Sequence, residues 1–238
     1  MRRKAYFSNL DAMETYSIIW DFDGTLLPND PYDSEQTLMR YKIDEAGEKI
    51  PAILHALAHI MIFADRKEYL RSMFKRFYVR FMKGTPRTSL DKVSELLAEK
   101  ISSADRQAIM DLKKQGFTMI VLSCGTADLS ERVLKMAGLA DCFDIIEGNR
   151  FTFENGCITG MTYAMGNPDD KRMFLQKCGI PPEDTIAVGD GYTDIPMLDW
   201  ARQAIVIDRS GKKNTQFRNK NYQFISSIPE ILKLIPEF

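Results

Sequence analysis

The sequence lacks several features that would point to a particular class of protein. Its 238 residues hold four scattered cysteines with no CxxC spacing, which excludes a disulfide scaffold and a cysteine zinc site. Lys and Arg total 32 against 33 Asp and Glu, so no overall field favours nucleic acid or an anionic membrane. The basic N-terminus leads into no apolar stretch of about 7–15 residues. We therefore expect no secretory signal, reduced thiols and a cytoplasmic protein.

What the sequence does contain is the composition of an ordinary folded protein. Hydrophobic residues make up 45% and charged residues 27% of the chain, which excludes a disordered or collagen-like protein. A chain of this length can form one large core and a smaller module. One domain with an insertion is therefore expected.

Short apolar runs alternate with helical patterns over most of the chain. The expected buried strands are residues 16–20, 117–122, 144–146, 185–188 and 204–207. The expected helices are residues 104–115, 128–137 and 168–178, each followed by a glycine that can end it. This alternation predicts an α/β fold with a doubly wound parallel sheet. The Asn155-Gly156 pair predicts a short β-hairpin.

Residues 31–103 interrupt this alternation with three successive helical patterns, at 33–48, 51–64 and 65–83. Asp33 and Gln36 have the spacing of a capping pair at the start of the first. The second is apolar but shorter than the roughly 20 residues that cross a bilayer, so we expect a buried helix and no membrane partner. We predict an α/β core formed by residues 1–30 and 104–238, with an inserted helical cap at residues 31–103.

Four short motifs lie at the ends of predicted elements, where open α/β sheets bind ligands. They are Asp21-Phe-Asp-Gly-Thr25, Ser123-Cys-Gly125, Lys171 in Pro168-Asp-Asp-Lys, and Gly189-Asp-Gly-Tyr-Thr-Asp194. If the carboxylates of Asp21, Asp23 and Asp190 converge, each pair about 4 Å apart repels by about 4 kcal/mol at an effective dielectric near 20. A hard cation with oxygen ligands, such as Mg²⁺, would relieve that repulsion.

In this order the four motifs resemble those of the haloacid dehalogenase superfamily. The inserted helices, the hairpin and the segment GIPPEDTIAVGDGYTDIPML at residues 179–198 look like its phosphoserine phosphatase branch. The resemblance implies a Rossmann-like core and an enzyme, a Mg²⁺-dependent phosphatase that hydrolyses a small phosphate monoester.

The resemblance also implies a role for each motif residue. Asp21 would be the nucleophile that forms an aspartyl-phosphate, and Asp23 the general acid and base. Asp21, Asp190 and the carbonyl of Asp23 would bind Mg²⁺, with Asp194 acting from behind them or through water. The phosphate would be held by Ser123, the N–H of Gly125 and Lys171.

The substrate is less determined than the chemistry. Phosphoserine phosphatases carry an acidic residue soon after the first motif and an Arg in the cap. Asp30 lies near the acidic position, and Arg71 and Arg76 are candidates for the cap cation. Thr193 stands where that branch commonly has Asn. Phosphoserine, other phosphorylated acids, sugars and lipid head groups therefore remain candidates.

Two sequence features permit other interpretations. Residues 66–87 hold eight cations against one carboxylate, which fits a solvated face, a contact to an anionic substrate, or binding of nucleic acid or an acidic protein. We favour the substrate over nucleic acid, because a phosphate site is already predicted below the cap. His55 and His59 have the i,i+4 spacing of zinc-binding pairs, but the sequence suggests no third ligand, so we interpret them as packing or surface residues. A phosphotransferase is a further alternative, and the oligomeric state is left open.

Overall fold

The computed structural model describes residues 16–44, 50–65, 71–211, 217 and 219–235. Within them lies a seven-stranded sheet with the order β4-β3-β2-β1-β5-β6-β7. Its strands are β1 (Ser17–Trp20), β2 (Thr118–Thr126), β3 (Ile145–Glu154), β4 (Cys157–Thr162), β5 (Thr185–Gly189), β6 (Gln203–Ile207) and β7 (Gln223–Ile225). Neighbours pair in parallel except for β4, which runs antiparallel to β3. The predicted α/β fold class with a mostly parallel sheet is confirmed.

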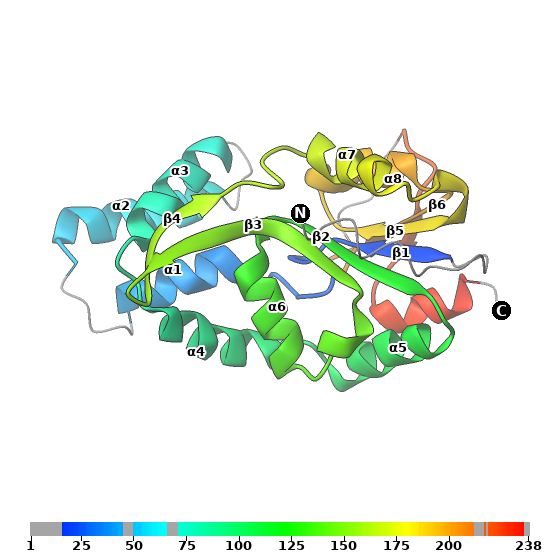
Figure 1. Cartoon of the computed structure of the whole chain (residues 1–238), viewed down its shortest axis with the longest axis horizontal. Coiled ribbons are helices and arrows are strands. Elements are labelled where there is room, and N and C mark those ends of the chain that lie inside the picture. Colours follow the sequence, from blue (N-terminus) through cyan, green and yellow to red (C-terminus); the bar gives the residue numbers. More distant parts are fainter. Residues whose placement is uncertain (1–15, 45–49, 66–70, 212–216, 218, 236–238) are drawn as a thin grey trace.

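Helices cover both faces of the sheet (Figure 1). In the view of Figure 1, α7 (Asp169–Cys178) and α8 (Ile195–Trp200) lie above the sheet, and α5 (Ser103–Lys114) and α6 (Ala127–Met136) lie below it. Residues of β1 alternate between the two layers: Ile18 and Trp20 are buried in one hydrophobic core and Ile19 in the other. A strand buried on both faces is apolar at successive positions, which explains the run from Ile18 to Trp20.

The predicted core elements are present, with ends displaced by a few residues. The hairpin is confirmed: Asn155 and Gly156 both have positive φ, at 50° and 78°, as a tight turn between β3 and β4 requires. The strand expected at 144–146 and the first arm of the hairpin are one continuous strand, β3. The sequence analysis missed β7 and α8, because elements of three and six residues are too short to show a period.

Four helices connect β1 to α5: α1 (Ser34–Asp44), α2 (Ala52–Asp65), α3 (Arg71–Met82) and α4 (Arg87–Ala98). Three helical patterns were predicted here, and α4 was missed. Its Asp91 pairs with Arg132 of α6 at 2.8 Å, so α4 packs against the core. The division into a core and a cap at residues 31–103 stays a prediction. Among the described residues, no helix combines the length and apolar character needed to span a membrane.

The expectation that residues 51–64 form a buried helix is wrong. Ala58, Met61 and Ile62 are buried, but Ile53, Leu57, Ile60 and Phe63 are 83%, 42%, 61% and 66% exposed. The helix α2 lies at the outer end of the molecule (Figure 1), where α1 and α3 contact one face of it. An apolar sequence alone does not reveal how many neighbours a helix has.

The register of the central strands places the motifs at one edge of the sheet. Trp20 pairs with Val121 of β2 on one side and with Val188 of β5 on the other. The residues that follow these three positions therefore emerge side by side. This edge, where the strand order reverses around β1, is the usual binding position in open α/β sheets.

Candidate active site

Lys171 and Asp21 form the centre of the predicted site. Lys171, in the first turn of α7, is fully buried, and its Nζ lies 2.6 Å from Asp21 Oδ1 and 2.6 Å from Asp194 Oδ1. Thr25 Oγ1 donates to the other oxygen, Oδ2, of Asp21 at 3.3 Å. Buried charges persist when they are paired and hydrogen-bonded. The lysine thereby joins the loop after β1 to the loop after β5.

The loop after β5 holds its two carboxylates in different ways. Asp194, in the short 3₁₀ turn Tyr192–Asp194, accepts hydrogen bonds from the N–H groups of Asp190 and Gly191 at 2.8 and 3.0 Å. Asp190 lies against the first motif: a Cβ on Gly24, whose φ is +89°, would be 2.0 Å from Asp190 Oδ2. Gly24 is required both by its backbone angle and by this close approach.

The buried charges shift one another's pKa values. Burial raises the pKa of Asp21 from 3.8 to about 7. The nearby carboxylates of Asp194 and Asp190 also raise it, whereas the charge of Lys171 lowers it. Burial opposes the charge of Lys171, but the carboxylates of Asp194 and Asp21 outweigh it and raise the pKa of the ammonium. The lysine therefore stays charged at neutral pH, while Asp21 needs more positive charge nearby to be fully ionised.

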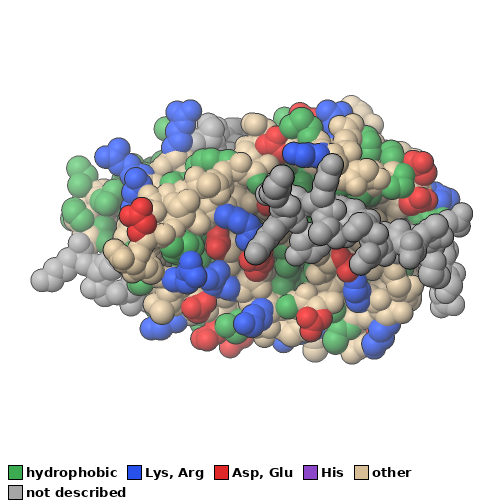
Figure 2. All heavy atoms as spheres, viewed as in Figure 1, with side chains coloured by type: hydrophobic (Ala, Val, Ile, Leu, Met, Phe, Trp, Pro, Cys, Tyr) green, Lys and Arg blue, Asp and Glu red, His purple; other side chains and the backbone are tan. Residues whose placement is uncertain are grey.

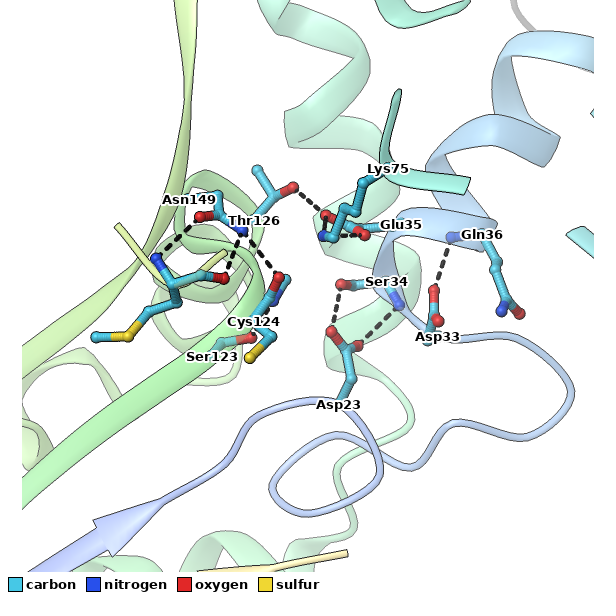
Figure 3. A network of polar contacts seen from close by, with 12 residues as sticks. Asp23, Asp33, Ser34, Glu35, Gln36, Lys75, Ser123, Cys124, Thr126 and Asn149 are labelled. Carbon is cyan, nitrogen blue, oxygen red and sulfur yellow. Dashed lines mark hydrogen bonds and ion pairs between the residues drawn. The ribbon is translucent and has the colours of Figure 1, made fainter. Parts of the chain in front are cut away.

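Asp23 is held by the first residue of α1 (Figure 3). The N–H and the Oγ of Ser34 both donate to its carboxylate, each at 2.8 Å. Burial raises the pKa of Asp23 to about 6, against the hydrogen bonds from Ser34 and with a smaller contribution from Asp21. A carboxyl that titrates near neutral pH is suited to donate and accept a proton.

The role of Ser34 was not predicted from the sequence. A serine at the start of a helix often makes hydrogen bonds through its side chain, but the prediction covered only the neighbouring capping pair, Asp33 and Gln36. That pair is present, since the N–H of Gln36 donates to Asp33 Oδ1 at 2.7 Å.

Ser123 and Gly125 line the same cavity as Asp21. One of the two predicted phosphate donors, the N–H of Gly125, already makes a hydrogen bond within the protein. The N–H of Gly125 donates to Ser123 Oγ at 2.9 Å, so phosphate binding by this N–H requires that the bond be shared or exchanged. A Cβ on Gly125 would lie 3.0 Å from Asp23 Oδ2. The position therefore favours glycine because of space.

A buried asparagine supports this end of β2, and no sequence motif indicated it. Asn149 of β3 donates from Nδ2 to the carbonyl of Cys124 at 2.9 Å, and its Oδ1 accepts from the N–H groups of Ala164 and Met165 at 3.1 Å (Figure 3). The side chain ties the end of β2, at Ser123–Gly125, to the segment that leads into α7. Only the fold brings these segments together.

A second polar network joins the inserted helices to the sheet (Figure 3). Glu35 of α1 binds Lys75 of α3 through both carboxylate oxygens, at 2.5 Å, and accepts from the Oγ1 of Thr126 at 2.6 Å. Another cation of the basic run, Arg87, lies over the ring of Phe153 at 4.2 Å. At least these two cations therefore have partners within the fold. On the face in Figure 2, Lys and Arg side chains are interspersed with Asp and Glu.

Residues of the first, second and fourth sequence motifs line a cavity of about 290 Å³. Asp21, Asp23, Asp190, Ser123 and Gly125 line it, as does the predicted substrate contact Asp30; further lining residues are Asn29, Asp33, Gln36, Asp65 and Thr193. Lys171 lies beneath Asp21. Each of the core motifs identified from sequence is therefore brought to one place.

Of the two predicted cap cations, the structure describes the side chain of Arg76 alone, and it does not line this cavity. Arg76 lines a second cavity, of about 490 Å³, with Lys75, Tyr163 and Tyr192. Cys124 and Thr193 line both cavities, so the two adjoin. Arg71 is the first residue of α3, but its side chain falls outside the described residues.

The donor set fits a hard divalent cation. Carboxylate oxygens of Asp21, Asp190 and Asp194 all lie within 4.8 Å of one another, and Asp194 is already bound to Lys171. Oxygen ligands with room for water are what Mg²⁺ requires. Burial, with the nearby carboxylates of Asp194 and Asp190, raises the pKa of Asp21, so a cation beside it would favour the ionised form. Asp21 and Asp190 are thus suited to hold such an ion, with Asp194 behind them.

Comparisons with known proteins give the family. A model of the haloacid dehalogenase-like hydrolases matches residues 18–199. A phosphoserine phosphatase of Archaeoglobus fulgidus is 27% identical over 247 residues, covering 100% of this chain and 68% of the relative.

Two solved structures have the same fold. One is a substrate-bound phosphoserine phosphatase complex, with a TM-score of 0.72 and 22% identity over 94% of this chain and 100% of that one. The other is a phospho-aspartyl intermediate analogue of phosphoserine phosphatase, with a TM-score of 0.69, 22% identity and the same coverage. The resemblance inferred from the four motifs is confirmed: the chain belongs to the haloacid dehalogenase-like hydrolase family and is similar to its phosphoserine phosphatase branch.

Proposed function

We propose that the protein is a Mg²⁺-dependent phosphatase that hydrolyses a small phosphate monoester through an aspartyl-phosphate on Asp21. The observation that carries the proposal is the buried Lys171, bound to Asp21 and Asp194 at 2.6 Å each, beneath a cavity that Asp23 also lines. The similarity to phosphoserine phosphatases supports it. Mg²⁺, held by Asp21, Asp190 and the carbonyl of Asp23, would neutralise charge on the phosphate and polarise it.

In the first half of the reaction, a carboxylate oxygen of Asp21 attacks phosphorus and the bond to the leaving oxygen breaks. Asp23 gives its proton to that oxygen, so the alcohol leaves neutral. Lys171 offsets negative charge while the phosphoryl group moves to Asp21. The hydroxyl of Ser123 can donate to a phosphoryl oxygen, because its own oxygen accepts from Gly125 and its hydrogen is left for another partner.

In the second half, the ionised Asp23 removes a proton from water as the water oxygen attacks the aspartyl-phosphate. The bond between phosphorus and the Asp21 oxygen breaks, inorganic phosphate is released, and both carboxyls return to their starting states. The two hydrogen bonds from Ser34 hold the Asp23 carboxyl in one orientation through both halves.

The cavity suits a small substrate. Its 290 Å³ is at the lower end of the range of ligand sites, and the adjoining cavity lined by Arg76 offers space for a larger leaving group. Phosphoserine is a candidate because of the similarity to phosphoserine phosphatases. Other phosphorylated acids, sugars and lipid head groups remain to be compared with it.

The test is phosphate release from a panel of small monoesters that includes phosphoserine, with Mg²⁺ or with a chelator. We expect Mg²⁺-dependent turnover that is lost in Asp21→Asn, together with a phosphorylated protein that Asp21→Asn does not form. Asp169→Asn, an exposed carboxylate on α7 that pairs with Arg172, is the matched control. Full activity of Asp21→Asn would exclude the assigned nucleophile.

A further inference from the structure

A second group of metal-ligand side chains lies on the inserted helices, apart from the candidate active site. Asp44 is the last residue of α1, and His55 and His59 are on α2. One ligand atom from each residue lies within 4.8 Å of the others. The chain has only two histidines, and both are in this group. The sequence suggested no third ligand for the histidine pair. In the structure Asp44, on a different helix, takes that position.

The two imidazoles are arranged to share a ligand. Their ring centroids are 4.8 Å apart, with the planes tilted by 55°, because residues four apart lie on one face of a helix. Within the described part of the chain, neither imidazole makes a hydrogen bond. Both side chains are half-buried, so they are accessible from solvent. Their nitrogens are available as ligands when the rings are neutral.

The carboxylate of Asp44 already forms an ion pair with Arg40, but this pair is weak. Arg40, one turn earlier on α1, lies 2.6 Å from Asp44 Oδ2, and both side chains are about one-third exposed, at 34% and 35%. Ion pairs of this exposed i,i+4 kind contribute little. A divalent cation at the histidine pair can therefore displace the arginine or bind the second carboxylate oxygen.

We propose that Asp44, His55 and His59 form a zinc-binding site that joins the end of α1 to α2. Two imidazole nitrogens and one carboxylate oxygen are a typical zinc set, with water in the fourth position, whereas Mg²⁺ disfavours imidazole. Zinc ligands lie about 2.0–2.2 Å from the metal, so the side chains must move closer together than 4.8 Å, which exposed rotamers permit. The site fixes α2 relative to α1, the helix whose first residue holds Asp23. The proposal does not depend on the phosphatase activity.

The two histidines make a direct test possible by NMR. The full chain, in excess Mg²⁺ to occupy the carboxylate site at Asp21, is titrated with Zn²⁺ at a pH above the ordinary pKa of histidine. We expect the imidazole proton signals of both histidines to shift together and to saturate at one equivalent. Zinc at the Asp21 site would leave these signals in place, so the two sites are distinguished. Signals that stay unshifted, or a shift of one histidine only, would overturn the proposal.

Surface variants separate the three-ligand site from a simple histidine pair. Asp44→Asn should weaken zinc binding by about tenfold or more, since even residues that only orient metal ligands contribute this much. Arg40→Gln, which frees the Asp44 carboxylate, should tighten it by up to about fivefold. Both side chains are about one-third exposed, so both variants should fold. If Asp44→Asn binds zinc as tightly as the natural protein, the carboxylate is not a ligand and the proposal fails.

Discussion

The strand-end site and the inserted helices both contain a lysine bound to carboxylates, but the charges balance differently. Lys171 bridges Asp21 and Asp194, and Asp23 and Asp190 line the same cavity, so carboxyls outnumber the buried ammonium there. Lys75 pairs with Glu35, and Glu35 accepts a further bond from Thr126. Surplus negative charge in a buried site requires protons or a cation. The strand-end site is thus arranged to take up ligands, whereas the pair on the helices is satisfied and positions the helices.

The largest expected effect tests this difference directly. In Lys171→Met the carboxylates of Asp21 and Asp194 lose their buried partner, which should reduce the free energy of unfolding by about 3–5 kcal/mol at neutral pH and abolish turnover. Urea unfolding of the metal-free protein measures it. Arg172→Met, on the same helix but 46% exposed, should change the stability by less than about 0.5 kcal/mol. Equal losses in the two variants would contradict a special role of the buried lysine.

The next largest effect concerns the contact between Ser34 of α1 and Asp23 of the strand-end site. Ser34→Ala removes one of the two hydrogen bonds that orient Asp23. In the proposed mechanism Asp23 protonates the leaving oxygen, so we expect kcat/KM for an alkyl phosphate to fall by about 10–100-fold. For p-nitrophenyl phosphate, whose leaving group needs no proton, the loss should be less than about threefold.

The comparison of the two substrates separates positioning of Asp23 from general damage. Thr37→Ala is the control on the same helix, because Thr37 Oγ1 donates to the carbonyl of Asp33 instead. If Ser34→Ala lowers kcat/KM equally for both substrates, the Ser34 hydroxyl does not assist proton transfer from Asp23.

The surplus charge of the strand-end site predicts a pH-dependent response to Mg²⁺. The pKa values of Asp21 and Asp23 are raised to about 7 and about 6 in the folded protein, above the unfolded value of 3.8. The folded state then binds more protons, so in the metal-free protein these groups reduce stability as the pH rises from about 4 to 7. Ionised carboxylates bind Mg²⁺ more tightly.

The measurement is thermal unfolding with and without Mg²⁺ at about pH 5 and pH 7.5. A Mg²⁺ concentration near 100 times the dissociation constant should raise Tm by about 5–10 °C at the higher pH, and by clearly less at the lower pH. The increase should be absent in Asp190→Asn. A Tm increase that is the same at both pH values would contradict a site whose carboxyls must lose protons first.

The smallest expected effect lies in the adjoining cavity. Arg76 is exposed, so in Arg76→Gln we expect KM for a carboxylate-bearing substrate to rise by about two- to fivefold, with kcat unchanged. Arg80→Gln, exposed on the same helix, is the matched control. If KM is unchanged for every substrate on the panel, this cavity does not receive the leaving group.

The strand-end site was predicted from the sequence more accurately than the inserted helices. At the strand ends, Asp21, Ser123 and Asp190 could be brought together from sequence, because the carboxyl ends of parallel strands lie at one edge of a sheet. In the inserted helices, the helical periods predicted α1 to α3, but not which faces are covered. This is why the exposed face of α2 was misjudged and why α4, which packs on α6, was missed.

The sequence by itself determined the family, the α/β class, the chemical identity of the site residues and the turn at Asn155-Gly156, because these depend on local patterns and on motif order. Only the tertiary structure decided the contacts between distant segments: Ser34 on Asp23, Asn149 on the carbonyl of Cys124, and Asp44 beside His55 and His59. Such contacts depend on how helices and strands pack in three dimensions. No short-range period in the chain records that packing.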